Sequence, residues 1–370
     1  MRRVVIEQLR PGMVIGRTIV GYSGKALLAK DTMLNELYIS RLAKLGIGSV
    51  YVKDGLGDVD IPEIITQEVL SSVSNKLSTT IKVFSANQVL AVDVLKKSVN
   101  LLLDNLLANR NMLVQLDEIR TYSDYLFTHS INVAVLSIMT GLALGYMERN
   151  LAELGLGALL HDIGMIAIDA SIVANSEALS AMEEEKILEH PEIGFNILRT
   201  YDEISKTAAH IAFQHHENVD GTGYPRQLHG FGIIEYARIV AVADAFDALI
   251  ADRPERKGCN TTEALMTIKN QIDCRFDPVI VEAFASNIAM YPIGSLVCLN
   301  TGQIGLVTSL TKINSDHPVI TVVCDENGKL ISPVHEINLT QSREVSIEKR
   351  LSDEETDRIR VQIQNHNLQS

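Results

Sequence analysis

This sequence contains few cysteines, and its basic residues are outnumbered by its acidic ones. Its four cysteines, at positions 259, 274, 298 and 324, form no CxxC pair. We therefore expect neither a thiolate zinc site nor a disulfide framework, and we expect the thiols to be reduced, as in a cytosol. A net charge of −13 leaves no general basic face, which argues against a nucleic-acid polymer or an anionic membrane as a partner. A local basic pocket for a small phosphate is compatible with that charge.

Long apolar runs are also missing. The most hydrophobic stretch, residues 131–147, is interrupted by Asn132, Ser137 and Thr140, so it is expected to be a buried helix rather than a membrane span. The N-terminal segment contains no long apolar region, and we therefore expect no signal peptide. Together these features predict a cytoplasmic protein that has no membrane partner.

The length of 370 residues and the hydrophobic share of 46% predict two or three globular domains. The predicted segments are a small α+β N-terminal regulatory module (1–60), a helical linker (61–118), an all-α core (119–287), a small antiparallel β module (288–345) and a polar tail (346–370). The linker helices are expected either to pair between subunits or relay a signal, or to pack against the helices that follow. Nothing in the N-terminal module has catalytic spacing.

Hydrophobic periodicity predicts the elements inside these segments. In the N-terminal module we expect strands at 4–6, 17–20, 26–28 and 48–52 and a helix at 34–45 that ends at Gly46. In the core we expect helices at 125–147, 151–160, 181–190, 193–199, 204–216 and 235–251, with Ser180 as an N-cap. In the β module we expect strands at 295–299, 304–309 and 319–324, and no site chemistry.

One dipeptide organises the candidate site. His161-Asp162 follows the apolar run 151–160, and burying a carboxylate in apolar surroundings is costly unless a positive charge neutralises it. A divalent cation is the simplest candidate, and a core histidine bonded to its own neighbour is the alternative for an isolated pair. Asp244 poses the same problem, since the other positions of its helix are mostly apolar.

Further histidines downstream favour the metal hypothesis. Imidazole and carboxylate ligands without thiolates suit iron, manganese, zinc or nickel. A first set is His129, His161, Asp162 and Asp244, and a second set is His190, His215 and His216. The two sets suit two neighbouring ions bridged by Asp162, and such a pair can activate water and stabilise an in-line phosphoryl displacement. Asp247, one turn after Asp244, is expected to orient a ligand or the substrate. His210 has no matching partner and is expected to be structural.

Five motifs carry a family resemblance. They are THSINVA (128–134), HDIG (161–164), EHPEIG (189–194), HHENVDGTGYP (215–225) and ARIVAVADAFDAL (237–249), followed by Arg253-Pro254. In order and spacing this region, from about 119 to 287, resembles the HD-GYP family, a branch of the HD-domain metal phosphohydrolases. The resemblance implies an HD-type helical bundle as the core of a multidomain protein. It also implies hydrolysis of cyclic di-GMP to linear pGpG, or further to GMP.

The resemblance also assigns roles to residues. The implied metal ligands are His129, His161, Asp162, His190, His215, His216 and Asp244, with His161 and Asp162 at the catalytic centre. The implied substrate-binding residues are Gly223, Tyr224, Pro225, Asp247, Arg253 and Arg256. Two divalent ions are expected, iron or manganese, with zinc or nickel as alternatives. A homodimer and signalling partner proteins are compatible with the flanking modules.

Two departures from the family pattern bear on activity. Members with a third metal use a Glu where this chain has Tyr125, so we expect two metals. Most members have a phosphate-contacting Lys where this chain has Met165, and losing a charge-assisted contact costs roughly 1.5–3 kcal/mol. The segment 172–182 also lacks the usual Gly-Lys-Leu and contains Asn175-Ser176-Glu177. The alternative function is therefore a weak or inactive HD-GYP protein that binds cyclic di-GMP as a receptor or scaffold. A phosphohydrolase for another nucleotide is a third hypothesis, disfavoured by the second histidine set.

Overall fold

The computed structural model of this chain describes most of its residues. They are residues 1–21, 25–45, 47, 49–53, 59, 63–110, 112–113, 125–173, 180–251, 258–310, 317–342, 344–352, 355–360 and 362. They form two compact units, the first made of Met1–Ile64, Asn111–Ser123 and Ile288–Ser370, the second of Ile65–Arg110 and Asp124–Asn287. Within the described ranges, no helix has both the length and the apolarity needed to cross a bilayer.

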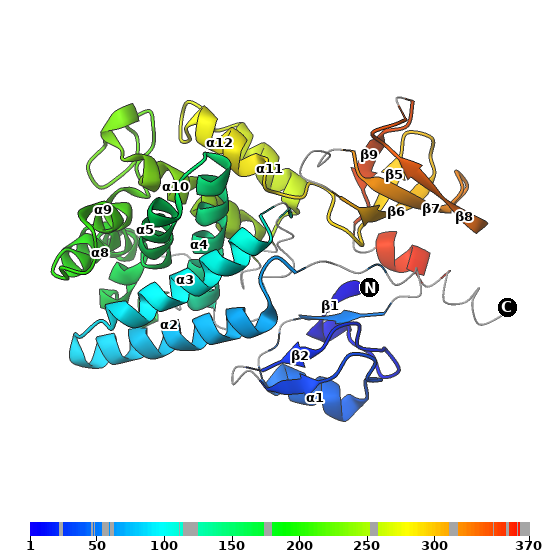
Figure 1. The fold of residues 1–370 in the computed structure, drawn as a ribbon, viewed down its shortest axis with the longest axis horizontal. Coiled ribbons are helices and arrows are strands. Elements are labelled where there is room, and N and C mark those ends of the chain that lie inside the picture. The colour runs from blue at the N-terminus through cyan, green and yellow to red at the C-terminus, as the bar shows by residue number, and fades with distance from the viewer. Residues whose placement is uncertain are drawn as a thin grey trace. The chain divides into compact units, whose positions relative to one another are not determined.

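The second unit is helical (Figure 1). In chain order its elements are α2 (Gln67–Asn87), α3 (Val92–Ala108), α4 (Tyr125–Ala143), α5 (Glu148–Leu159), η3 (Ile163–Ala167), α6 (Ala170–Val173), α7 (Ala181–Leu188), α8 (His190–Leu198), α9 (Lys206–Gln214), η4 (Gly230–Gly232), α10 (Glu235–Ile250), α11 (Thr261–Lys269) and α12 (Pro278–Ala285). The predicted core helices are all present, with ends shifted by a few residues. Ser180 caps α7 through a capping box with Glu183, as the sequence predicts.

The segment expected as a linker supplies α2 and α3, which pack against each other, and α3 also packs against α5. Of the two expectations for these helices, packing against the helices that follow is the one observed. Leu95 and Leu102 of α3 are fully buried (both 0% exposed). Burial of such side chains is what stabilises an amphipathic helix pair of this kind.

The centre of the helical unit is α10, which packs against α4, α9, α11 and α12. Most of its side chains are buried, including both of its aspartates, Asp244 and Asp247. Small residues allow the close packing around it. In α5, a Cβ atom on Gly157 would lie 2.3 Å from Cδ1 of Ile211 and 3.1 Å from the carbonyl oxygen of Ala208, both in α9, so glycine at this position favours the close approach of α5 and α9.

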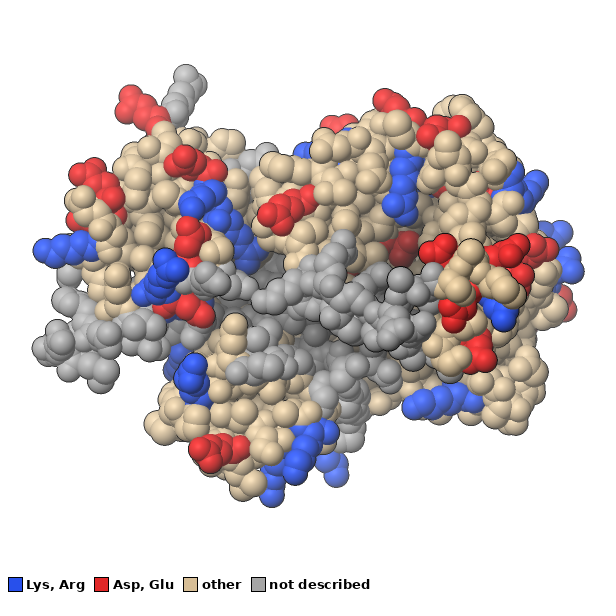
Figure 2. Space-filling view, turned by 180° about the vertical axis from the view of Figure 1, so that it is seen from behind, with Lys and Arg blue, Asp and Glu red and all other residues tan. Residues whose placement is uncertain are grey.

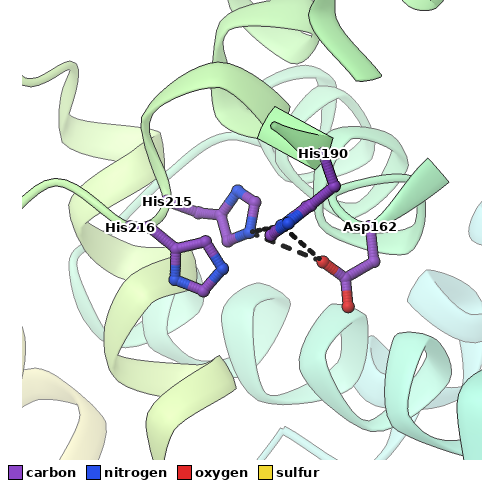
Figure 3. A group of neighbouring side chains, drawn as sticks. All are labelled: Asp162, His190, His215 and His216. Carbon is purple, nitrogen blue, oxygen red and sulfur yellow. Dashed lines mark hydrogen bonds and ion pairs between the residues drawn. The ribbon is translucent and has the colours of Figure 1, made fainter. Parts of the chain in front are cut away.

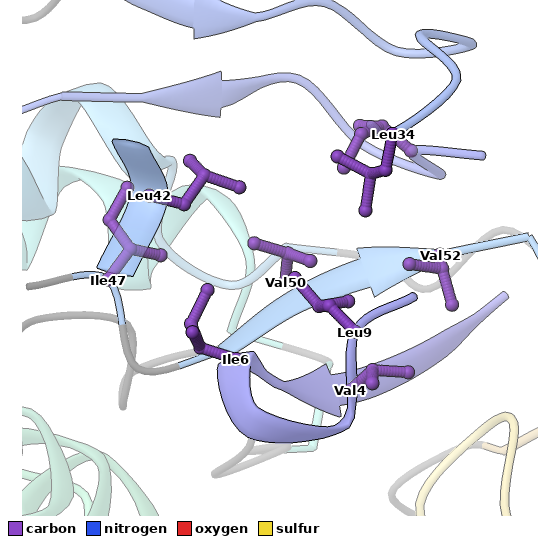
Figure 4. Packing of buried hydrophobic residues seen from close by; sticks show 9 residues of the cluster. Val4, Ile6, Leu9, Leu34, Leu42, Ile47, Val50 and Val52 are labelled. Atoms are coloured by element: carbon purple, nitrogen blue, oxygen red, sulfur yellow. The ribbon is translucent and has the colours of Figure 1, made fainter. Parts of the chain in front are cut away.

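The N-terminal part of the first unit is a small α+β fold. Its elements are β1 (Arg2–Val5), η1 (Ile6–Gln8), β2 (Ile19–Val20), β3 (Ala26–Leu28), α1 (Glu36–Lys44) and β4 (Ser49–Val52). β1 pairs antiparallel with β4, and β2 pairs antiparallel with β3. Aliphatic side chains from these elements, among them Ile6, Leu42 and Val50, form one hydrophobic cluster (Figure 4). The expected cap residue Gly46 lies outside the described residues.

The C-terminal part of the first unit contains an antiparallel sheet of strand order β8-β7-β6-β5-β9. Its strands are β5 (Leu296–Leu299), β6 (Ile304–Ser309), β7 (Val319–Cys324), β8 (Leu330–Asn338) and β9 (Ile347–Arg350). The sequence predicted the first three but not β8 or β9. In β8, Pro333 and polar residues interrupt the apolar alternation. β9 lies in the segment expected as a polar tail, and it is recruited by backbone pairing with β5, which leaves no signal in side-chain patterning.

One face of the molecule carries charged side chains of both signs (Figure 2). On the face drawn in Figure 2, acidic and basic side chains are interspersed, and the coloured residues form no extended basic patch. This distribution fits the net charge of −13. An anionic ligand would therefore need a local set of cations rather than a general basic face.

Candidate metal centre

The structure brings together all seven side chains that the sequence singled out as ligands. They come from α4 (His129), the turn after α5 (His161 and Asp162), the first residue of α8 (His190), the end of α9 (His215 and His216) and α10 (Asp244). They form two groups, and within each group the ligand atoms lie within 4.8 Å of one another. The first group is His129, His161 and Asp244, and the second is Asp162, His190, His215 and His216.

Asp162 lies between the two groups. Its Oδ1 atom is 3.3 Å from Nε2 of His190 and 3.5 Å from Nε2 of His215 (Figure 3). Its Oδ2 atom is 3.4 Å from Nε2 of His161 and 3.8 Å from Nε2 of His129. Each carboxylate oxygen thus faces a different set of imidazoles, which is the arrangement of a ligand that bridges two cations.

The other ring nitrogens determine which way the imidazoles present their lone pairs. Nδ1 of His161 lies 2.8 Å from the carbonyl oxygen of Ala158, and Nδ1 of His190 lies 2.6 Å from that of Ile187. Nδ1 of His215 likewise faces main-chain carbonyl oxygens. A carbonyl can only accept, so Nδ1 carries the hydrogen and Nε2 keeps its lone pair. The Nε2 lone pairs are therefore available to a metal.

Asp247 performs the same task for His129. One of its oxygens lies 2.8 Å from Nδ1 of His129, and the other accepts a hydrogen bond of 2.7 Å from the amide of Asn132. The carboxylate is 2% exposed. Of the two roles expected for Asp247, orienting a ligand fits these contacts, because both oxygens are engaged inside the protein.

Two features test whether this cluster fits a metal. Nε2 of His161 is buried and has no hydrogen-bond partner among the described residues. Nε2 of His190 lies 3.4 Å from Nε2 of His215, so two lone pairs face each other with their Nδ1 hydrogens already committed. Buried polar atoms are normally satisfied, and a cation in each ligand group would satisfy the three nitrogen atoms. The donor set of imidazoles and carboxylates, without thiolates, fits iron, manganese, zinc or nickel.

The electrostatics of the two groups differ. Burial lowers the pKa of His215 and, reinforced by the His215 ring, lowers that of His216 well below its ordinary value. Burial also disfavours the charged form of His129, but hydrogen bonds to Asp244 and Asp247 outweigh it and raise its pKa well above the ordinary value. Burial raises the pKa of Asp162 and Asp244, yet the adjacent imidazoles outweigh it and keep both carboxylates ionised.

A close backbone contact at Gly164 determines the position of the His161-Asp162 pair. A Cβ atom on Gly164 would lie 2.0 Å from the carbonyl oxygen of His190 and 2.7 Å from the amide nitrogen of Gly194. Since both neighbours are backbone atoms, neither can move aside as a side chain would. Gly164 therefore allows η3 to rest directly on α8, which brings Asp162 to His190.

The loop after His216 is built around Glu217, which is 2% exposed. Its carboxylate accepts hydrogen bonds from the main-chain amides of Arg226 (2.7 Å) and Leu228 (2.9 Å). The loop carries Tyr224 back over His216, where the two rings stack with centroids 4.7 Å apart. The sequence analysis missed Glu217. Its position directly after the His doublet and before the Asp-Gly turn was the available signal.

The structure describes only some of the other residues that the sequence singled out. Gly223 packs so tightly that a Cβ atom there would lie 2.3 Å from the amide nitrogen of Asn218, and Pro225 follows Tyr224 through a cis peptide bond. Arg253 and Arg256 lie outside the described residues, as does the segment 174–179 that contains Asn175-Ser176-Glu177. Tyr125 is described only as the first residue of α4.

Comparisons with known proteins find relatives for the part of the chain that carries these residues. Residues 102–280 match the HD domain family, and residues 296–358 match a KOW domain associated with HD domain. The chain is 32% identical over 235 residues to a cyclic di-GMP phosphodiesterase of Pseudomonas aeruginosa, which covers 64% of this chain and 56% of that protein. It is 31% identical over 209 residues to the cyclic di-GMP phosphodiesterase PdeB of Borreliella burgdorferi, which covers 56% of this chain and 55% of that protein.

Among solved structures, a HDGYP protein from Bdellovibrio bacteriovorus aligns with 76% of this chain and 97% of its own, with a TM-score of 0.47 and 20% identity. The chain spans little more than half the length of the two curated relatives. The family match over residues 102–280, together with the histidine-aspartate cluster, identifies an HD domain in this chain. Within this domain lie the HDIG (161–164) and Gly-Tyr-Pro (223–225) motifs by which the sequence resembles the HD-GYP family.

Proposed function

We propose that this chain is a metal-dependent phosphodiesterase that hydrolyses cyclic di-GMP to linear pGpG, or further to GMP. The observation that carries the proposal is the Asp162 carboxylate, with one oxygen facing His190 and His215 and the other facing His161. A bridged pair of cation positions suits phosphodiester hydrolysis. The names of the curated relatives, both cyclic di-GMP phosphodiesterases, support cyclic di-GMP as the substrate.

Two divalent ions held at these positions would supply Lewis-acid stabilisation of a phosphoryl group and a lowered pKa for a water molecule. Asp162 sets the spacing of the two positions. The main-chain carbonyls behind His161, His190 and His215 hold those imidazoles in the tautomer that binds a metal. Tyr224 covers His216, so it bounds the site on that side and limits the access of water.

Iron and manganese are the metals we propose, with zinc or nickel as alternatives, because the donor set contains nitrogen and oxygen but no sulfur. We propose two ions rather than three, since position 125 is occupied by Tyr, which has no carboxylate to bridge a further ion. Metal analysis after anaerobic loading with each metal alone, scored as ions per chain, tests both statements. Three ions per chain would contradict the second.

The decisive experiment loads the protein anaerobically with iron or manganese and separates the products formed from cyclic di-GMP. We expect pGpG, and no product from Asp162→Asn, which removes the bridge. Asp202→Asn is the matched control, because Asp202 is exposed and lies on a turn outside both ligand groups. The variants Asp244→Asn and His216→Ala are each expected to lose mainly one ion. Protein that carries two ions and yields no product would contradict the proposal.

Met165 favours one alternative, a receptor that binds cyclic di-GMP without cleaving it. The residue is partly exposed, and its amide donates to the carbonyl oxygen of Asp162, so it lies beside the site where the family places a lysine. Calorimetric titration of the metal-loaded protein with cyclic di-GMP distinguishes the two functions. Tight binding without product over hours would favour the receptor. Cleavage of another nucleotide in preference to cyclic di-GMP would favour the third hypothesis.

A further inference from the structure

Arg275 is an uncompensated cation close to the loop that carries Tyr224. It lies between α11 and α12, is partly exposed, and has its guanidinium over the ring of Phe276 at 5.0 Å from the ring centroid. Among the described residues, no carboxylate lies within ion-pair distance of it.

Backbone hydrogen bonds attach this turn to the Tyr224 loop. The carbonyl oxygen of Arg275 accepts from the amide of Val219 at 3.3 Å, and that of Cys274 accepts from the amide of Asp220 at 3.0 Å. Within the turn, the amides of Arg275 and Phe276 both donate to the carbonyl oxygen of Gln271. The backbone of Arg275 is therefore fixed relative to the loop rather than free to swing away.

Tyr224 links Arg275 to the metal centre. Its ring stacks on His216 with an interplanar angle of 17°. Burial raises its pKa, and the Asp244 and Asp162 carboxylates raise it further, whereas the Arg275 guanidinium lowers it. The tyrosine thus lies within electrostatic reach of both ligand carboxylates and Arg275.

Two other arginines among the described residues, Arg238 and Arg226, also contact aromatic rings. Arg238 forms an ion pair with Asp277 and lies over the ring of Phe231. Arg226 follows Pro225 directly, but its guanidinium lies over Phe213 of α9, at 5.6 Å from the ring centroid. Arg226 and Arg275 thus both lie over a phenylalanine ring, and of these three cations Arg275 is the one whose charge acts on Tyr224.

A cyclic dinucleotide carries two phosphodiester charges, and only one of them can be attacked at the metals at a time. The second phosphate needs a nearby cation, because the protein as a whole is acidic, with a net charge of −13. Position 165, beside Asp162, offers a thioether rather than a cation. An arginine next to the site can form a bidentate, charge-assisted contact with a phosphate, and Arg275 is placed to do so.

We propose that Arg275 binds the phosphate of the cyclic dinucleotide that is not being cleaved. This inference rests on the proposed function, since it concerns the substrate of the same site. Arg275 determines affinity for a substrate with two phosphates and takes no part in the bond cleavage itself. A small diester with a single phosphate would not reach it.

The test compares the wild-type protein with Arg275→Gln on two substrates, cyclic di-GMP and bis(p-nitrophenyl) phosphate. For cyclic di-GMP we expect a KM raised roughly 10- to 100-fold with kcat changed less than about threefold, as for the loss of one charge-assisted contact. For the small diester we expect unchanged kcat/KM, and in both cases unchanged metal content. Arg275→Lys should restore part of the affinity, because it restores the charge but not the bidentate geometry.

Arg199→Gln is the matched control. Arg199 also lies over a phenylalanine ring, that of Phe195, but at the end of α8, and its loss should leave both substrates unaffected. Equal losses on both substrates would mean that Arg275 supports the fold, and an unchanged KM for cyclic di-GMP would also overturn the proposal. If the wild-type protein cleaves the small diester but not cyclic di-GMP, the proposed function fails. The Kd for cyclic di-GMP then decides the role of Arg275: a weaker Kd in the variant supports it, and an equal Kd or no binding by either protein overturns it.

Discussion

Nδ1 of His129 lies 2.8 Å from Oδ2 of Asp247, while Nε2 of the same ring lies 3.2 Å from Oδ1 of Asp244. The imidazole is therefore held between two carboxylates three residues apart on α10. Asp244 belongs to the ligand group, whereas Asp247 is buried behind the ring and is itself held by Asn132. This relationship assigns different tasks to two acids that look alike in the sequence.

The variant Asp247→Asn tests this division. An amide in place of the carboxylate removes the charge that favours the Nδ1-protonated tautomer of His129. Since removing such a partner typically weakens metal binding about 10- to 100-fold, we expect a loss of that size. Competition with a chelating dye measures it, and Asp202→Asn serves as the control. Unchanged metal affinity, together with a raised KM for substrate, would instead place Asp247 in substrate binding.

The pKa of His129 predicts proton release on metal binding. Burial opposes its charged form, but Asp244 and Asp247 raise its pKa well above the ordinary value, so the metal-free protein holds a proton there at pH 7. Metal binding needs the neutral ring, so loading should release about one proton from this residue. The release should shrink as the pH rises through the raised pKa. Calorimetry in buffers of different ionisation enthalpy measures it.

The raised pKa of His129 also determines how the stability of the metal-free protein changes with pH. A raised pKa means that His129 stabilises the metal-free fold below its ordinary pKa of about 6.5. That contribution is lost as the pH rises through the folded-state pKa.

The variant Asp247→Asn tests which residue releases the proton. When this variant is titrated to saturation with metal at pH 7, it should release fewer protons than the wild-type protein. An unchanged number in that variant would contradict the assignment of the proton to His129.

Met165→Lys tests whether the missing family cation limits turnover. Met165 is partly exposed beside Asp162, so a lysine there can extend into the site without being buried. We expect kcat/KM for cyclic di-GMP to rise roughly 10- to 100-fold, as for one added charge-assisted contact. Met165→Gln, with similar length and no charge, is the control. If both variants behave like the wild-type protein, another residue already supplies the cation.

Gly164→Ala should be damaging in spite of its small size. The added Cβ would lie 2.0 Å from the carbonyl oxygen of His190, so η3 and α8 would have to separate. We expect a loss of about 1–3 kcal/mol of stability, as for overpacking, and weaker binding at the ligand group that contains His190. Gly232→Ala is the control, because its Cβ would meet nothing closer than 3.9 Å. Thermal unfolding and metal content measure the two effects, and equal melting temperatures for the two variants would contradict this account.

Much of the helical unit could be predicted from periodicity. The expected helix 235–251 is α10 (Glu235–Ile250), and the capping role of Ser180 is confirmed. Strand β9 could not be predicted, since Glu348 and Lys349 give it no apolar pattern and its place depends on backbone bonds to β5. Local patterns report which face a segment buries, but not which distant segment will pair with it.

The site shows the same limit. The sequence alone determined which residues have metal-binding chemistry, because imidazole and carboxylate groups recur at buried positions where an uncompensated charge would be costly. Only the tertiary structure decided that Asp162 turns one oxygen to each set of histidines, that Asp247 supports His129, and that Arg275 lies beside the Tyr224 loop. These relationships depend on contacts between elements far apart in the chain, made possible by backbone approaches such as that of Gly164 to His190. Distances of a few ångströms between such elements are set by the packing of the whole helical unit, which no local sequence pattern encodes.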